Sequence, residues 1–175
     1  MSEAPVVART PVVHQPPTGT TLVLALGNPL RGDDGVGAAV LEHLRRSGAL
    51  PGQVDLVDGG TAGLETVLLL QGYRRAMIID AADMRLAPGA WRRLPAAGSS
   101  LGSRDLSAGH TLHSAGLAEA LALGEALGVL PETIEIFAIQ PLEVGWAPGL
   151  SQQVQACTAD VADAILDTLS RPATE

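Results

Sequence analysis

The chain has 175 residues, a formal net charge of −8, a hydrophobic content of 46% and an aromatic content of 2%. This length suits one domain with a core of leucine, valine, isoleucine and alanine. All basic residues are arginines, which excludes a Schiff-base enzyme and a P-loop because both need lysine. An acidic chain with few aromatic rings is also a poor nucleic-acid binder. The single cysteine, Cys157, excludes a disulfide framework and a four-cysteine zinc site.

The hydrophobic pattern predicts strands and helices in alternation. Short apolar runs predict strands at residues 21–27, 54–57, 76–79 and 133–139, with an edge strand at 90–94. Apolar residues at helical spacing predict helices beginning at residues 33, 61, 114 and 152, and ending near 46, 70, 127 and 169. Residues 96–107, rich in glycine and serine, predict a mobile loop. This alternation predicts an α/β fold with a parallel sheet and helices on both faces.

The ends of the chain and its apolar runs bear on domain organisation and compartment. Residues 1–19 hold four prolines and no apolar stretch, which predicts a disordered tail before a single domain at 20–172. The longest apolar runs fall far short of the roughly 20 residues that cross a bilayer, so we expect no membrane insertion. A single free thiol suits a reducing compartment, and we expect a cytoplasmic protein.

Carboxylates follow three of the predicted strands. Asp34 follows the first strand after a short loop, Asp58 the second strand and Asp80 the third. Ligands of parallel sheets bind at these carboxyl ends. Crowded carboxylates raise one another's pKa unless a cation joins them, so we favour a metal-ligand role over a capping role for Asp34 and Asp80. Asp33, beside Asp34, would repel a nucleotide phosphate at the helix start, which disfavours a dinucleotide site.

Histidine and nucleophile candidates complete the chemistry. His110 and His113 lie just before the third predicted helix, and an Asp, Asp, His set with open positions suits Zn or Ni. GSSLG at residues 98–102 matches G-x-S-x-G, but it lacks the strand before and the helix after that a nucleophile elbow needs. We expect Cys157 to be a core residue. The sequence therefore predicts a metal site and no nucleophile.

Five segments keep the order and spacing of one known family. They are GNPLRGDDGVG (27–37), DGGTAG (58–63), IIDAADMRLAPG (78–89), SAGLAEALAL (114–123) directly after His113, and Gln140-Pro141. Together, from about residue 21 to residue 169, they closely resemble the hydrogenase maturation endopeptidases. The resemblance implies a three-layer αβα sandwich around a five-stranded, mostly parallel twisted sheet.

The resemblance also implies an activity and a site. The activity is one cut that removes the C-terminal extension of the [NiFe]-hydrogenase large-subunit precursor after nickel insertion, with the bound nickel recognised as part of the substrate. The implied catalytic residues and metal ligands are Asp34, Asp80 and His113, with His110 as the alternative histidine. Asp58 is implied to bind the substrate peptide. Asp33 and Asn28 look like structural supports of the first loop.

The implied cofactor is nickel supplied by the precursor, and we expect that zinc or cadmium can also occupy the same site in vitro. The implied partner is the precursor alone, and we expect a monomer. Two questions stay open. The metal could activate a water for amide attack or serve only as a recognition handle, and no residue pattern identifies a general base. The alternative function is a non-cleaving, nickel-dependent chaperone or adaptor for hydrogenase assembly.

Overall fold

The computed structural model describes residues 20–48, 50–96 and 114–171. Its elements in chain order are β1 (Thr21–Leu26), the 3-10 turn η1 (Gly32–Gly35), α1 (Val36–Ser47), β2 (Val54–Gly60), α2 (Thr66–Leu70), β3 (Arg75–Ala81), β4 (Trp91–Pro95), α4 (Ser114–Leu127), β5 (Thr133–Ile139) and α5 (Gln152–Leu169). The five strands form one sheet in the order β2-β1-β3-β5-β4. Only β4, at one edge, runs antiparallel to its neighbour. The predicted five-stranded, mostly parallel α/β fold is confirmed.

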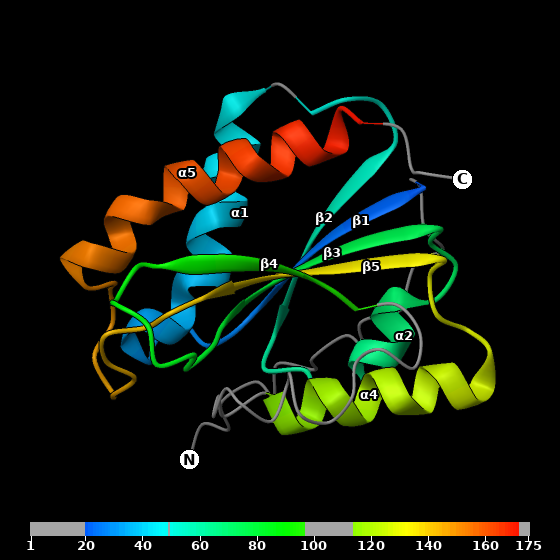
Figure 1. The fold of residues 1–175 in the computed structure, drawn as a ribbon, viewed down its shortest axis with the longest axis horizontal. Coiled ribbons are helices and arrows are strands. Elements are labelled where there is room, and N and C mark those ends of the chain that lie inside the picture. Colours follow the sequence, from blue (N-terminus) through cyan, green and yellow to red (C-terminus); the bar gives the residue numbers. More distant parts are fainter. Residues whose placement is uncertain (1–19, 49, 97–113, 172–175) are drawn as a thin grey trace, which may run out of the picture.

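Helices cover both faces of the sheet, with α1 and α5 on one side and α2 and α4 on the other (Figure 1). Successive strand residues point to opposite faces, so β3 sends Met77 and Ile79 into the core beneath α1 and α5. It sends Ala76 and Ile78 into the core beneath α2 and α4. Because both faces of the central strands are covered, these strands are apolar along most of their length, as is typical of parallel sheets, and β3 carries its charged residues, Arg75 and Asp80, near its ends.

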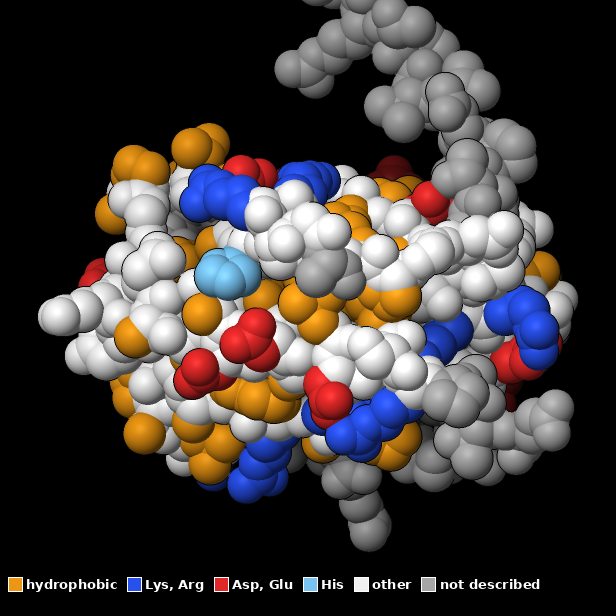
Figure 2. All heavy atoms as spheres, turned by 90° about the horizontal axis from the view of Figure 1, so that it is seen from above, with side chains coloured by type: hydrophobic (Ala, Val, Ile, Leu, Met, Phe, Trp, Pro, Cys, Tyr) orange, Lys and Arg blue, Asp and Glu red, His pale blue; other side chains and the backbone are white. Residues whose placement is uncertain are grey.

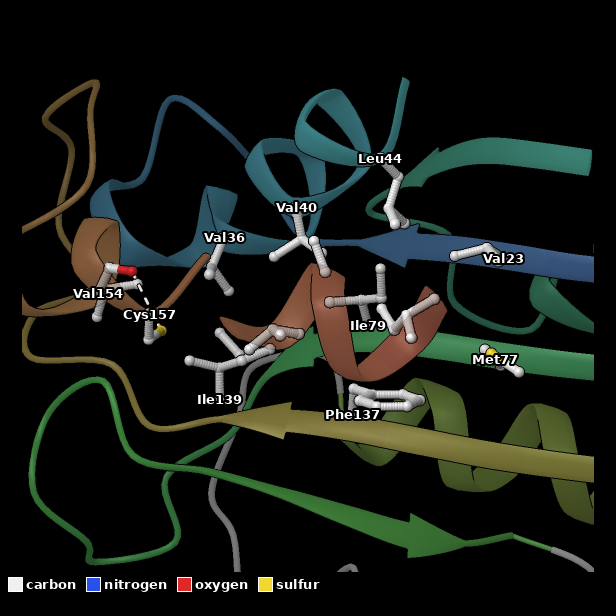
Figure 3. Packing of buried hydrophobic residues seen from close by; sticks show 14 residues of the cluster. Val23, Val36, Val40, Leu44, Met77, Ile79, Phe137, Ile139, Val154 and Cys157 are labelled. Atoms are coloured by element: carbon white, nitrogen blue, oxygen red, sulfur yellow. Dashed lines mark hydrogen bonds between the residues drawn. The ribbon is translucent and has the colours of Figure 1, made fainter. Parts of the chain in front are cut away.

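The core between the sheet and the helices α1 and α5 is made mostly of aliphatic side chains around Phe137 (Figure 3), against which the partly buried Trp91 packs. Val36, Val40 and Leu44 of α1 recur at helical spacing, and all three are fully buried. Val154 and Cys157 of α5, on the same face of the sheet, belong to the same cluster. The low aromatic content of the chain is therefore matched by a core of interlocking aliphatic side chains.

Several predicted boundaries differ from the structure. The first helix, expected from residue 33, begins at Val36 after the 3-10 turn η1, and the third strand runs over Arg75–Ala81 instead of 76–79. The helix expected from Thr61 begins only at Thr66. The chain first turns at Ala62, whose N–H donates to the carbonyl of Gly59 and whose carbonyl accepts the Thr66 hydroxyl (3.0 Å). The second strand also continues beyond Val57 to Gly60. The predicted tail at 1–19, most of the predicted loop at 96–107, GSSLG, His110 and His113 lie outside the described residues.

The surface over α1 and α5 mixes charges of both signs with hydrophobic side chains (Figure 2). Arginines there lie beside carboxylates, as in the pairs that Glu42 makes with Arg45 and Arg46 on α1. None of the helices in the described part of the chain combines the length and apolar composition that spanning a membrane requires.

Candidate metal and active site

Two buried carboxylates lie together at the carboxyl end of the sheet. Asp80 is the second-last residue of β3 and is 4% exposed. Asp34 lies in η1, which follows β1, and is 2% exposed. By strand alternation, Asp80 continues the series of Ala76 and Ile78 and faces the side covered by α2 and α4. The structure therefore brings together two of the three predicted ligands.

The first loop is built to hold Asp34. Its carboxylate oxygen Oδ2 accepts a hydrogen bond from the backbone N–H of Asn28 (2.9 Å). The Asn28 side chain in turn accepts from the N–H of Leu30 (3.0 Å), as in an Asx turn. Gly27 has a φ of 121°, and a Cβ there would lie 1.9 Å from the carbonyl oxygen of Asp34. Only glycine fits that approach, and the predicted supporting role of Asn28 is confirmed.

The carboxylate of Asp80 is electrostatically unusual. Burial, followed by the nearby negative charge of Asp34, raises the pKa of Asp80 to about 8, although a hydrogen bond from the Ala81 backbone opposes the shift. Its oxygen Oδ1 is buried without a hydrogen-bond partner in the described part of the chain. A buried oxygen left in this state calls for an ion or water. The carboxylates of Asp34 and Asp80, with Oδ1 of Asp80 unsatisfied, fit a divalent cation. Such a cation would displace the Asp80 proton.

Asp33 is equally buried but fully used by the protein. Its carboxylate accepts four hydrogen bonds, from the N–H groups of Leu142 (2.8 Å), Glu143 (3.2 Å) and Ser151 (2.6 Å) and from the Ser151 hydroxyl (2.8 Å). These bonds fasten the loop between β5 and α5 to the first loop. The prediction that Asp33 is a structural support is confirmed.

Asp58 also lies at the carboxyl end of the sheet, but its side chain is on the opposite face from Asp80. It pairs with the penultimate position of β1 and is exposed, and its carboxylate accepts a hydrogen bond from the N–H of Gly60 (3.0 Å). Val54 and Leu56 of the same strand pack toward α1 and α5. By alternation Asp58 shares their face, whereas Asp80 faces the opposite side. Its role toward substrate remains a prediction.

The start of α4 lies on the same side of the sheet as Asp80. Its first turn packs closely on the segment after β2, since a Cβ added to Gly116 would lie 3.1 Å from the Cα of Gly63. His113 directly precedes Ser114, the first residue of α4. Both His113 and His110 lie outside the described residues, and no group of three metal-binding side chains occurs within them. The histidine ligand therefore stays a prediction.

Gln140 has a role that the sequence indicated only through the family-like pair Gln140-Pro141. It is 6% exposed, and its side-chain oxygen accepts hydrogen bonds from the N–H groups of Met84 (2.7 Å) and Leu86 (3.1 Å). Its amide nitrogen donates to Asp83 (3.2 Å). The glutamine thus shapes the loop that leaves β3 directly after Asp80. A polar glutamine directly after the apolar run at residues 136–139 is the signal that could have suggested this.

Cys157 is not a nucleophile. It is buried in the core cluster, where its thiol lies against the carbonyl of Val154 (3.2 Å; Figure 3). Burial raises the pKa of this thiol, which disfavours the reactive thiolate. The prediction of a core role is confirmed.

A family model described as hydrogenase maturation protease (HycI) matches residues 38–168. The chain belongs to the hydrogenase maturation protease family. The hydrogenase expression/formation protein HoxM of Cupriavidus necator is 32% identical over 153 residues, which cover 86% of this chain and 74% of HoxM.

Solved structures agree with this membership. The hydrogenase maturating endopeptidase HybD from E. coli superposes with a TM-score of 0.74 at 27% identity, over 85% of this chain and 91% of HybD. A hydrogenase 2 maturation peptidase from a Thaumarchaeota archaeon gives a TM-score of 0.65 at 33% identity, over 86% of this chain and 97% of that one. This hydrogenase maturation protease is therefore a peptide-bond hydrolase, as the motif resemblance predicted.

Proposed function

We propose that this hydrogenase maturation protease removes the C-terminal extension of the [NiFe]-hydrogenase large-subunit precursor, and that it recognises nickel already bound by that precursor. The observation that supports this best is the pair Asp34 and Asp80, buried together at the carboxyl end of the sheet with one oxygen of Asp80 unsatisfied. A structural carboxylate would have its partners within the protein, as Asp33 has.

In this proposal Asp34 and Asp80 bind the nickel of the precursor, and His113 supplies the third protein ligand. Three ligands of this kind leave coordination positions for groups of the substrate. At neutral pH the raised pKa of Asp80 leaves its carboxyl group largely protonated before the substrate arrives. Binding of the precursor's nickel would release that proton, so Asp80 is ionised only when the site holds its substrate.

A metal ion held at this position by Asp34, Asp80 and His113 would supply Lewis-acid chemistry, by polarising a carbonyl or by lowering the pKa of a water. The protein's own contribution is positional. Asn28 holds the carboxylate of Asp34, and Gln140 orders the loop that follows Asp80. We assign Asp58, exposed at the same edge of the sheet, to contact with the precursor peptide.

The test is to incubate the purified protein with precursor made with and without nickel, and to measure product masses. We expect one C-terminal fragment from the nickel-loaded precursor and none from the nickel-free form or from casein. Equal cutting of the nickel-free precursor would overturn nickel recognition. A large subunit of mature length in cells that lack this protein would overturn the cleavage itself and favour the chaperone alternative.

A further inference from the structure

An exposed tryptophan and an arginine form a pair at the end of the sheet that carries the proposed site. The guanidinium carbon of Arg31 lies 5.5 Å from the ring centroid of Trp146, within the range of a cation–π contact. Trp146 is 80% exposed, and Leu30 and Leu142 nearby in the two loops are 60% and 52% exposed. Large apolar side chains that remain this exposed, gathered beside a site, are typical of binding surfaces.

Arg31 carries a charge that the described protein does not neutralise. Its Nε atom is buried and has no hydrogen-bond partner within the described ranges, and none of the ion pairs found there includes it. Both carboxylate oxygens of Asp33, two residues away, accept hydrogen bonds from backbone and hydroxyl donors instead of from Arg31. A guanidinium stacked on a ring with donors to spare is suited to a carboxylate from outside the protein.

The two loops that carry this pair are fastened to each other. Besides the bonds of the Asp33 carboxylate, the N–H of Gly32 donates to the carbonyl of Ala147 (2.7 Å), next to Trp146. A cavity of about 270 Å³ lies between the loops, lined by Gly32, Asp33 and residues of the 142–151 loop. It is smaller than most small-molecule pockets, which hold about 300–1,000 Å³, and suits a side chain of a docked polypeptide.

We propose that Arg31, Leu142 and Trp146 form a docking surface for an extended segment of the precursor, with a carboxylate of that segment on Arg31 and an apolar side chain on Trp146. The inference rests on the proposed function. The precursor is the occupant because the two loops leave the carboxyl ends of β1 and β5, the strands on either side of β3, whose carboxyl end carries Asp80. Arg31 also stands three residues before Asp34 on one of these loops. Charge complementarity sets the chemistry of the segment, since Arg31 has no anionic partner among the described residues, although Glu143 also lines the cavity.

Direct contact is tested by 19F NMR on protein labelled with 5-fluorotryptophan, titrated with unlabelled nickel-loaded precursor. The chain has two tryptophans, and the other, Trp91, lies in β4 against Phe137. We expect the Trp146 signal, assigned with Trp146→Phe, to shift or broaden at saturating precursor, and the Trp91 signal to stay. An unchanged Trp146 signal under conditions where the precursor is bound would overturn the proposal.

The energetic contribution is tested by steady-state cleavage with Trp146→Ala, Arg31→Gln and Arg31→Lys. We expect Trp146→Ala and Arg31→Gln to raise KM about tenfold with kcat within a factor of two, and Arg31→Lys to recover part of the loss. The matched controls are Arg46→Gln and Leu127→Ala, exposed residues at the helix ends remote from this edge, which should leave both constants unchanged. Thermal melting verifies that each variant is folded.

The outcomes separate the two proposals. If the wild-type protein cleaves the precursor but the surface variants match the controls, the docking surface is overturned and the proposed function stands. If the wild-type protein does not cleave the precursor, the proposed function fails. If kcat falls and KM does not change, Arg31 and Trp146 affect the chemical step instead of docking, which also overturns the proposal.

Discussion

Asp33 and Asp80 both lie at the carboxyl end of the sheet and are both almost fully buried, yet their surroundings differ. The carboxylate of Asp33 accepts four hydrogen bonds from the loop between β5 and α5. The carboxylate of Asp80 keeps one oxygen without a partner among the described residues, and its pKa is raised to about 8. The carboxylate of Asp33 is satisfied by hydrogen bonds within the protein, whereas the carboxylate of Asp80 is available to a bound cation.

This difference separates stability from function. A satisfied carboxylate contributes to folding, and removing its charge leaves buried donors unpaired. An unsatisfied carboxylate costs stability in the free protein, and that cost is recovered when a cation binds. The same Asp→Asn change should therefore act in opposite directions in the two regions.

The largest effect is expected on cleavage. Asp34→Asn and Asp80→Asn each remove one charge from the proposed metal site while keeping the shape of the side chain. We expect kcat/KM for nickel-loaded precursor to fall at least about 100-fold in each variant, because changes in groups that only support a metal ligand already cost 10–100-fold. The measurement is product mass against time, with circular dichroism to show that both variants fold. Near-normal cleavage by both would remove the metal assignment.

The next effect concerns the histidine. His113→Ala should abolish processing, whereas His110→Ala should reduce it only mildly, because the family-like segment SAGLAEALAL begins directly after His113. The two variants are controls for each other in one assay of precursor cleavage. The reverse ranking would move the ligand to His110, and mild effects in both would mean that neither is a ligand.

A smaller effect is expected on folding in the satisfied region. Asp33→Asn places an amide NH2 where N–H groups now donate, so at least one charge-assisted hydrogen bond is lost. We expect the free energy of unfolding to fall by about 2–4 kcal/mol in urea denaturation. The matched control is Asp167→Asn on the surface of α5, where the side chain is 65% exposed and the change should cost less than about 1 kcal/mol. Equal small losses would contradict the clamping role of Asp33.

The smallest effect should have the opposite sign. A carboxyl group whose pKa is higher in the folded than in the unfolded protein binds extra protons when folded, so stability is lost as pH rises from about 4 to about 8. Asp80→Asn removes this loss. Each pKa unit corresponds to about 1.4 kcal/mol, but the amide must also be buried, so we expect a net gain of roughly 1–3 kcal/mol at pH 8.

This gain is measured by thermal or urea denaturation of the metal-free protein with a chelator present. The free energy of unfolding of Asp80→Asn relative to wild type should rise between pH 4 and pH 8 and favour the variant at pH 8. A difference that does not change with pH, or a variant less stable than wild type at pH 8, would show that Asp80 is not an unsatisfied carboxylate. Added Zn²⁺ or Cd²⁺ should stabilise the wild type more than the variant.

The sequence by itself determined the fold class, the strand ends that carry Asp34, Asp58 and Asp80, and the family, because hydrophobic period and motif spacing are local properties of the chain. Only the tertiary structure decided how these carboxylates differ. The donors to the Asp33 carboxylate lie more than a hundred residues away in the sequence, and Asp58 lies on the opposite face from Asp80. Arg31 contacts Trp146 because the first loop packs against the loop between β5 and α5. Burial, hydrogen-bond partners and pKa depend on which distant segments come together, and no spacing along the chain contains that information.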